Sequence, residues 1–178
     1  MTRVMVLLGS LRATSVNRQL AETAISVAPD GVVVELFERL GELPFYSEDI
    51  DNDDVAEPVR TLREEAARAD AVLVVTPEYN GGIPAVLKNA IDWLSRPYGN
   101  GALKGKPLAV IGASMSSYGG KWAHDQARKS FAIAGTRVME SIELSLSLKT
   151  LGETPVRQHA ELAEKLLAIV TELAGHTQ

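Results

Sequence analysis

The sequence contains no cysteine. Disulfides, zinc sites with thiolate ligands and redox chemistry at a cysteine are therefore excluded, and a redox function would have to reside in a bound cofactor. Histidine is also scarce, with three residues. Among them, His124 falls within a predicted helix, without a second histidine or a carboxylate at metal-ligand spacing. We expect it to be a surface or capping residue, and we expect neither a metal site nor a catalytic dyad.

Long apolar runs and blocks of basic residues are also absent. No segment approaches the length needed to span a membrane, and residues 1–3 lead directly into a strand-like run. The formal net charge is −5, with basic residues scattered among acidic ones. These features argue against membrane insertion and against nucleic acid as a partner, so the cytoplasm is the expected location. We expect one domain over residues 1–178, which is long enough for a well-buried core.

Five apolar runs alternate with five stretches of helical periodicity. This alternation is typical of a parallel sheet buried on both faces, with right-handed crossovers. At this length it predicts a flavodoxin-like, doubly wound α/β fold with strand order 2-1-3-4-5 and helices on both faces. The expected strands are 4–8, 32–37, 71–75, 108–111 and 137–144, and the expected helices are 16–28, 58–69, 84–94, 121–134 and 155–174.

The first loop (residues 9–17) connects the first strand to the first helix. A helix N-terminus offers unpaired N–H groups and the positive end of the helix dipole, which favour a phosphate. The loop has a single glycine, so it is neither a dinucleotide fingerprint nor a Walker loop. An ordinary capped helix start, with Ser15 as N-cap and Arg12 in solvent, is the alternative. The side chains that could donate to a phosphate are those of Ser10, Arg12, Thr14, Ser15 and Asn17.

The second loop (residues 76–84) follows the third strand and reads Thr-Pro-Glu-Tyr-Asn-Gly-Gly-Ile-Pro. It is stiff at its proline-containing ends and permissive at its glycines, so its backbone could lie flat against a planar ligand. The N–H groups of Asn80, Gly81 and Gly82 would then meet polar atoms of a ring, and Tyr79 would pack on or beside it. A proline-capped turn into a helix is the alternative.

The third loop (residues 112–120) follows the fourth strand and is rich in small residues. Because the carboxyl ends of parallel strands meet at one edge of the sheet, the three loops are expected to converge there. That edge is where open α/β sheets bind their ligands.

Three motifs together resemble a known family. They are Gly9-Ser10-Leu11-Arg12 with Ser15 and Asn17, then Pro77-Glu78-Tyr79-Asn80 with Pro84 and Leu87-Lys88-Asn89-Ala90-Ile91-Asp92-Trp93, and then Gly112-Ala113-Ser114 with Gly119-Gly120. The chain is similar, over nearly its whole length, to the NAD(P)H-dependent FMN reductases, which include quinone, azo-dye and chromate reductases. The resemblance implies FMN as cofactor, NADPH or NADH as co-substrate, and a small-molecule electron acceptor.

The resemblance also implies a set of binding residues. The third loop departs from the family, which usually has a glycine near its middle, where this chain has Met115-Ser116-Ser117-Tyr118. The phosphate would be bound at Ser10, Arg12, Ser15, Val16 and Asn17, the isoalloxazine ring at Pro77, Glu78, Tyr79, Asn80 and Gly81, and the pyrimidine or ribityl side would be bordered by Ser114 and Ser117.

Members of this family are generally homodimers or homotetramers in which a neighbouring subunit helps to wall the flavin site. Trp93, at the edge of the apolar face of its helix, and the loop at Phe45-Tyr46 are our candidates for that contact. The margin of the core is the other interpretation of Trp93.

The implied reaction is a ping-pong hydride transfer, which requires no side-chain acid or base. Two other classes remain open from the sequence. A flavodoxin-like FMN electron carrier would have the same fold but would usually be strongly acidic around the flavin. A non-redox binder of a phosphorylated ligand, or a phosphohydrolase, could use the first loop but would leave the second loop without a purpose.

Overall fold

The computed structural model describes residues 1–152 and 154–177. Its sheet has the order β2-β1-β3-β4-β5, and every neighbouring pair is parallel. The predicted flavodoxin-like fold is thereby confirmed. The strands are β1 (Thr2–Leu8), β2 (Val32–Phe37), β3 (Ala71–Val75), β4 (Pro107–Ser114) and β5 (Arg137–Ser147).

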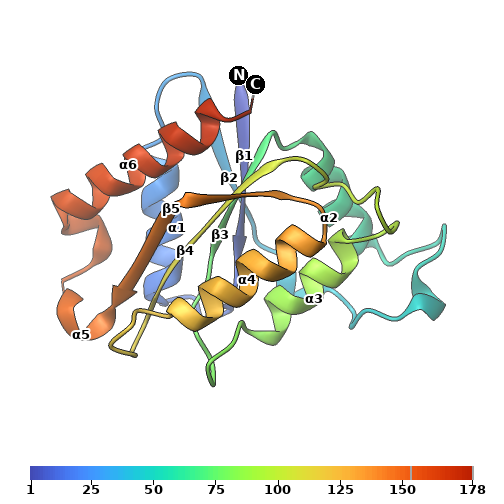
Figure 1. Ribbon diagram of the computed structural model, residues 1–178, viewed down its shortest axis with the longest axis horizontal. Helices are drawn as coiled ribbons and strands as arrows, with labels where there is room; N and C mark the ends of the chain where they lie inside the picture. Colours follow the sequence, from blue (N-terminus) through green and yellow to red (C-terminus); the bar gives the residue numbers. More distant parts are fainter. Residues whose placement is uncertain (153, 178) are drawn as a thin grey trace.

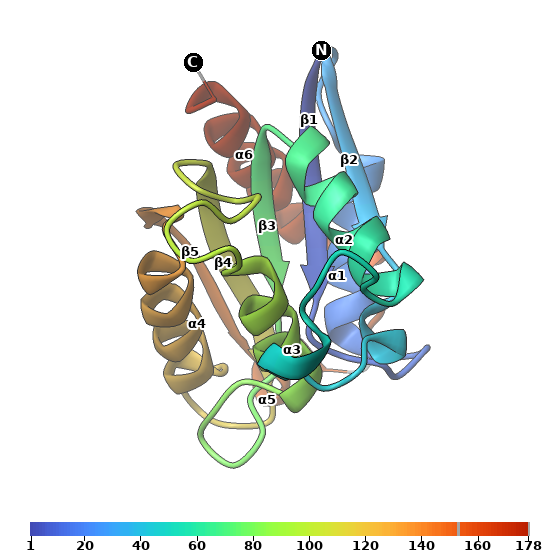
Figure 2. The ribbon, with the colours of Figure 1, turned by 90° about the vertical axis from the view of Figure 1, so that its right-hand side faces the viewer.

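Helices cover both faces of the sheet (Figures 1 and 2). One face packs against α2, α3 and α4, and the other against α1 and α6. No helix in the described part of the chain is both long enough and apolar enough to cross a membrane. The helices are α1 (Val16–Ser26), α2 (Glu57–Arg68), α3 (Ala85–Leu94), α4 (Lys121–Ile133), α5 (Leu148–Leu151) and α6 (Ala160–Gly175), with 3-10 turns at Leu40–Glu42, Glu48–Ile50 and Val156–Gln158.

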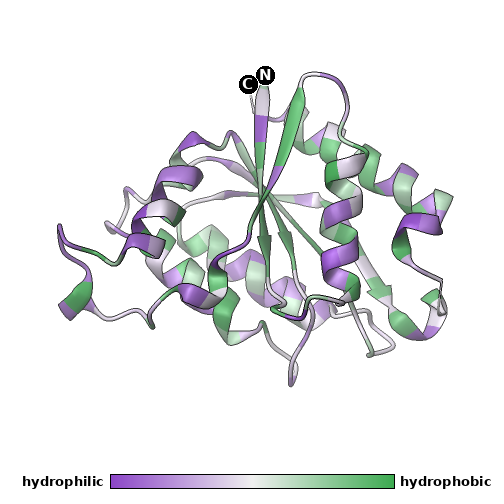
Figure 3. Cartoon of the chain, turned by 180° about the vertical axis from the view of Figure 1, so that it is seen from behind, coloured by the Kyte–Doolittle hydropathy of each residue, from purple (hydrophilic) through white to green (hydrophobic). Residues whose placement is uncertain are grey.

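The central strands are buried on both faces, which explains their continuous apolar sequences. In β1, Met5 and Leu7 point toward α2, α3 and α4, while Val4, Val6 and Leu8 point toward α1 and α6. All of β3 is buried. Figure 3 shows the resulting pattern, with hydrophobic strands inside and hydrophilic residues on the outer sides of the helices. The sheet is thus a rigid platform for the loops at its carboxyl edge.

Most predicted boundaries agree with the structure to within two residues, and the largest corrections concern β4, β5 and the last helix. β4 ends at Ser114 instead of residue 111, and β5 ends at Ser147 instead of residue 144, because the ladder continues through the pairs from Gly112↔Ser145 to Ser114↔Ser147. The last helix begins at Ala160, since Pro155 instead opens a 3-10 turn. The two strand ends were not predicted because they contain small and polar residues of low strand propensity. Pairing between the neighbouring strands stabilises them nonetheless.

β5 is irregular in its middle. Its register against β4 jumps between the pairs Leu108↔Val138 and Val110↔Glu143, so several residues of β5 bulge out of the ladder. Arg128 of α4 is buried beside the bulge, and its Nη2 donates to the Val110 carbonyl oxygen at 3.1 Å. A side chain therefore satisfies a carbonyl next to the point where the register breaks.

Trp93 lies in the core, so its predicted place at the edge of the apolar face is wrong. Its side chain is fully buried, its Nε1 donates to the Pro44 carbonyl at 2.8 Å, and its ring meets that of Tyr46 edge to face. Asn89 accepts from the Tyr46 N–H and donates to Pro44 O. These bonds fasten the residues on both sides of Phe45, whose own side chain is 79% exposed.

Candidate functional site

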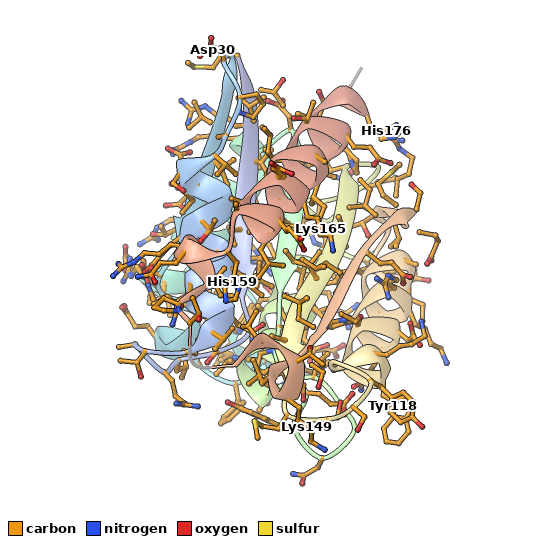
Figure 4. All side chains as sticks on the ribbon, turned by 90° about the vertical axis from the view of Figure 1, so that its left-hand side faces the viewer. Asp30, Tyr118, Lys149, His159, Lys165 and His176 are labelled. Atoms are coloured by element: carbon orange, nitrogen blue, oxygen red, sulfur yellow. The ribbon has the colours of Figure 1, made fainter. Side chains whose placement is uncertain are left out.

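The three loops converge at the carboxyl edge of the sheet, as predicted. Figure 4 shows Tyr118 and Lys149 at this end of the molecule, opposite Asp30 and His176. The loops enclose a cavity of about 460 Å³, a size within the range of about 300–1,000 Å³ that is typical of ligand sites. Its lining residues are Ser10, Arg12, Thr14, Ser15, Val16, Asn17, Pro77, Glu78, Tyr79, Ala113, Ser114, Met115 and Leu148.

The first loop presents the N-terminus of α1 to this cavity. Ser15 is the N-cap, and its Oγ accepts from the N–H of Arg18 at 3.0 Å. The N–H groups of Val16 and Asn17, in the first helical turn, have no partner within the helix. The cap that the alternative interpretation required is therefore present, and it leaves the N–H groups of two cavity-lining residues, Val16 and Asn17, without a partner in the helix.

Arg12 and Arg18 have different surroundings. Arg18 forms a bidentate ion pair with Glu38, in which Nη1 and Nη2 donate to the two carboxylate oxygens at 2.8 and 2.7 Å. This pair lowers the pKa of the Glu38 carboxyl group below its ordinary value. Arg12 is exposed and lines the cavity. Its guanidinium, with the hydroxyls of Ser10 and Thr14, gives the cavity a group of anion-binding donors.

Asn17 is buried, and its amide bonds in both directions with the backbone of Ala113 in β4. The second N–H of Nδ2 is left for a ligand. Asn17 therefore joins the first loop to the third, a structural role that the sequence did not reveal.

The second loop contains a two-residue hairpin. Tyr79 and Gly82 exchange both backbone hydrogen bonds, at 2.9 and 3.0 Å, and the intervening Asn80 and Gly81 have positive φ angles of 53° and 76°. Asn and Gly are the residues that tolerate such angles. The expectation that Gly82 offers its N–H to a ligand is wrong, because that N–H is bonded to Tyr79.

Other polar groups of the second loop are bonded to α4 or within the loop. Glu78 Oε2 accepts from the N–H of Ala123 at the start of α4, and the Ile83 N–H donates to Gln126 Oε1 at 2.8 Å. Thr76 Oγ1 donates to Pro77 O. Within the described residues, the N–H groups of Glu78, Asn80 and Gly81 have no hydrogen-bond partner. These three amides are the free donors of the second loop, and of the three residues only Glu78 lines the cavity.

The third loop contributes less than expected. Ser114 lines the cavity, whereas Ser117 does not, and neither do Asn80 and Gly81 at the hairpin tip. Sequence reasoning did not assign Ala113, Met115 and Leu148 to the site. Leu148 follows β5, so the rule that ligands bind beyond strand carboxyl ends would have indicated it.

His124 is buried, so the expected surface or capping role is wrong. Its Nδ1 lies 2.8 Å from Ser145 Oγ, and its Nε2 lies 3.2 Å from the Thr76 carbonyl oxygen. Burial lowers the pKa of His124 and keeps the imidazole neutral. A carbonyl can only accept, so Nε2 carries the proton and Nδ1 accepts from the Ser145 hydroxyl.

Among residues 1–152 and 154–177, no three or more His, Asp or Glu side chains are grouped so that they could hold a metal ion. The cavity instead combines helix-end amides and hydroxyls with a loop of backbone amides and one aromatic ring.

Residues 2–150 match the family model described as NADPH-dependent FMN reductase. The chain belongs to this family. It is 43% identical over 143 residues to a quinone reductase of Pseudomonas putida, covering 80% of this chain and 76% of the relative. It is 46% identical over 117 residues to a 2-hydroxy-1,4-benzoquinone reductase of a Burkholderia species, covering 66% of this chain and 63% of the relative. The family resemblance deduced from the motifs is confirmed.

A solved structure is similar over nearly the whole chain. FerB from Paracoccus denitrificans, described as a flavoenzyme NAD(P)H:(acceptor) oxidoreductase, superposes with a TM-score of 0.80 at 32% identity, covering 99% of this chain and 97% of FerB.

Proposed function

We propose that this protein is an FMN-dependent NAD(P)H oxidoreductase that reduces a small-molecule electron acceptor, with quinones as the first class to test. The observation that carries the proposal is that the same cavity is lined by the α1 N-terminus and Arg12 and by Pro77, Glu78 and Tyr79. Family membership and the names of the quinone reductase relatives support it.

The residues present fit FMN. At one end of the cavity, the amides of Val16 and Asn17 and the Arg12 guanidinium suit a phosphate. At the other end, the backbone of the second loop and the half-exposed Tyr79 suit a flat, uncharged ring. Bound FMN would supply the chemistry by accepting hydride from NAD(P)H and passing electrons to the acceptor.

The chain's own part in the reaction is to bind, to orient and to stabilise charge. The N–H group of Glu78, which lines the cavity, could donate to a ring bound there, and those of Asn80 and Gly81 could do so if the ring extends from the cavity to the hairpin tip. Such donors stabilise negative charge that develops on a ring. The proposed cofactor-binding residues are Ser10, Arg12, Ser15, Val16, Asn17, Pro77, Glu78, Tyr79, Asn80, Gly81, Ser114 and Ser117.

Anaerobic spectroscopy tests the proposal. Purified protein supplied with FMN should show the visible spectrum of a bound flavin, and that spectrum should bleach within seconds after NADPH or NADH is added. A subsequent addition of benzoquinone should restore it. Failure to retain or quench FMN would contradict the proposal. A bound flavin that neither nicotinamide bleaches would instead indicate the electron carrier.

We also propose that residues 1–178 act as one FMN-binding domain that assembles as a homodimer or homotetramer. The exposed Phe45, on a loop fastened to α3, is the candidate contact, since Trp93 is buried. NAD(P)H is generated inside cells, so we propose the cytoplasm as the place of action.

A further inference from the structure

His124 lies directly behind the second loop, in a space that two glycines leave open. A Cβ atom at Gly112 would lie 2.8 Å from Nε2 of His124, and one at Gly120 would lie 3.3 Å from it. The imidazole is fully buried and is bonded at both nitrogens, to the end of β3 and to β5. It therefore links α4 to two strands at the edge of the sheet that carries the cavity.

The atom that His124 holds is the carbonyl oxygen of Thr76, the residue between β3 and Pro77. Thr76 is packed from both sides. A Cβ atom at Gly9 would lie 2.5 Å from its Oγ1, and one at Gly112 would overlap its carbonyl oxygen. The orientation of the Thr76 peptide group thus determines where the second loop begins relative to the first loop.

We propose that His124 is a positioning residue for the flavin ring. Its Nε2–H bond to Thr76 O fixes the start of the second loop and, through it, the direction of the free amides of Glu78, Asn80 and Gly81. This inference rests on the proposed function, because it assumes that the ring is bound by these amides.

His124 does not act as an acid or base on the substrate. The side chain is without solvent exposure and does not line the cavity. Both ring nitrogens are bonded to protein atoms, so neither is available to exchange a proton with a ligand. Any effect of His124 on the reaction must pass through the loop that it holds.

Two substitutions of His124, by glutamine and by asparagine, test its two hydrogen bonds separately. In His124→Gln, the amide nitrogen can occupy the place of Nε2 and keep the bond to Thr76 O. In His124→Asn, the shorter amide reaches the place of Nδ1 and can keep the bond to Ser145, but the bond to Thr76 is lost. The measurements are dissociation constants for FMN and for riboflavin, and the midpoint potential of bound FMN.

His124→Asn should weaken the binding of FMN and of riboflavin equally, by about tenfold, because the hydrogen bond that orients the second loop is lost. It should also lower the midpoint potential, because misdirected amides stabilise the reduced ring less well. His124→Gln should restore both quantities to nearly the wild-type values. Circular dichroism and urea unfolding of both variants show whether the fold is retained.

Three results would overturn the inference. One is a folded His124→Asn protein with wild-type affinities and potential, and another is equal damage in the Gln and Asn variants. The third is a loss for FMN that riboflavin does not share. If the wild-type protein binds FMN and is bleached by NAD(P)H while any of these occurs, the proposed function stands and the role of His124 fails. If the wild-type protein binds no flavin, both fail.

Discussion

Asn17 and Ala113, which are 96 positions apart, form a closed pair of hydrogen bonds. Asn17 Nδ2 donates to the Ala113 carbonyl at 2.9 Å, and the Ala113 N–H donates to Asn17 Oδ1 at 2.8 Å. The side-chain amide thus takes the place of a neighbouring strand at the end of β4. It joins the first loop, at one side of the cavity, to the third loop at the other.

Replacing this amide with an apolar side chain of similar size should destabilise the fold. Asn17→Leu leaves a buried N–H and a buried C=O of Ala113 without partners, and we expect unfolding free energy to fall by about 2–4 kcal/mol. Urea denaturation measures the change. Asn100→Leu, at an exposed turn position, is the control and should be nearly neutral. Equal stability of the two variants would contradict the role given to the pair.

Arg12 should discriminate FMN from riboflavin. Arg12→Ala removes a charge-assisted contact to the phosphate, so the dissociation constant for FMN should rise by about 10–100-fold, while that for riboflavin changes by less than about twofold. Fluorescence quenching of each ligand provides the measurement. Arg60→Ala, on the outer side of α2, should leave both values unchanged. Equal losses of affinity for the two ligands in Arg12→Ala would contradict the placement of the phosphate at this end of the cavity.

Gly112 should tolerate no side chain. A Cβ atom there would overlap the Thr76 carbonyl and approach His124, both of which are held by other bonds. We expect Gly112→Ala to lower stability by about 2–4 kcal/mol and to abolish or strongly weaken flavin binding. Gly175→Ala is the matched control, because a Cβ atom at Gly175 meets nothing within 4 Å. A stable, flavin-binding Gly112→Ala protein would contradict this prediction and would show that the ends of β3 and β4 can move apart to make room for a side chain.

His124 should make stability depend on pH. Its pKa in the folded protein is lowered, mainly by burial and further by Arg128, while the hydrogen bond to the Thr76 carbonyl, Asp125 and Glu78 oppose the shift. The unfolded chain therefore binds the proton first as pH falls. The stability contribution is fully present above an ordinary pKa of about 6.5 and decreases below it.

Between about pH 7.5 and about pH 5.5, wild-type protein should lose up to about 1.4 kcal/mol more unfolding free energy than His124→Gln, which does not titrate. Urea midpoints at the two pH values give this difference. Equal losses of unfolding free energy in the two proteins would mean that His124 is protonated in the folded protein as easily as in the unfolded chain.

Phe45 should act in self-association and not in folding. Its side chain is exposed, whereas the residues on either side of it are bonded to α3. Phe45→Ser should shift sedimentation toward the monomer without changing the urea midpoint, because an exposed ring buries area only in an assembly. Tyr98→Ser, another exposed aromatic, is the control. If Phe45→Ser sediments like the wild-type protein, Phe45 does not contribute to the interface.

The sheet order could be predicted because its signals are local. Runs such as Ala71–Val75 are apolar throughout, and the helices between them repeat their apolar positions with helical spacing. The first and second loops could be found by the same reasoning, since ligands of such sheets bind where strands end.

What the sequence concealed depends on distant partners. His124 is buried because Gly112 and Gly120 leave room for its ring, and Trp93 is buried because a segment some fifty residues earlier, around Pro44, folds over it. Asn17 was expected to serve a ligand, yet most of its hydrogen-bonding capacity serves Ala113. No periodicity within one helix reports such contacts.

The bulge in β5 has a consequence for assembly. β5 forms one border of the sheet, and a further strand could add there only along a regular row of backbone donors and acceptors. The register jump after Val138 interrupts that row, and the three carboxylates of Asp125, Glu140 and Glu143 surround the nearby Arg128. This border is therefore a poor template for a strand from a second molecule, so the bulge disfavours growth of the sheet past β5.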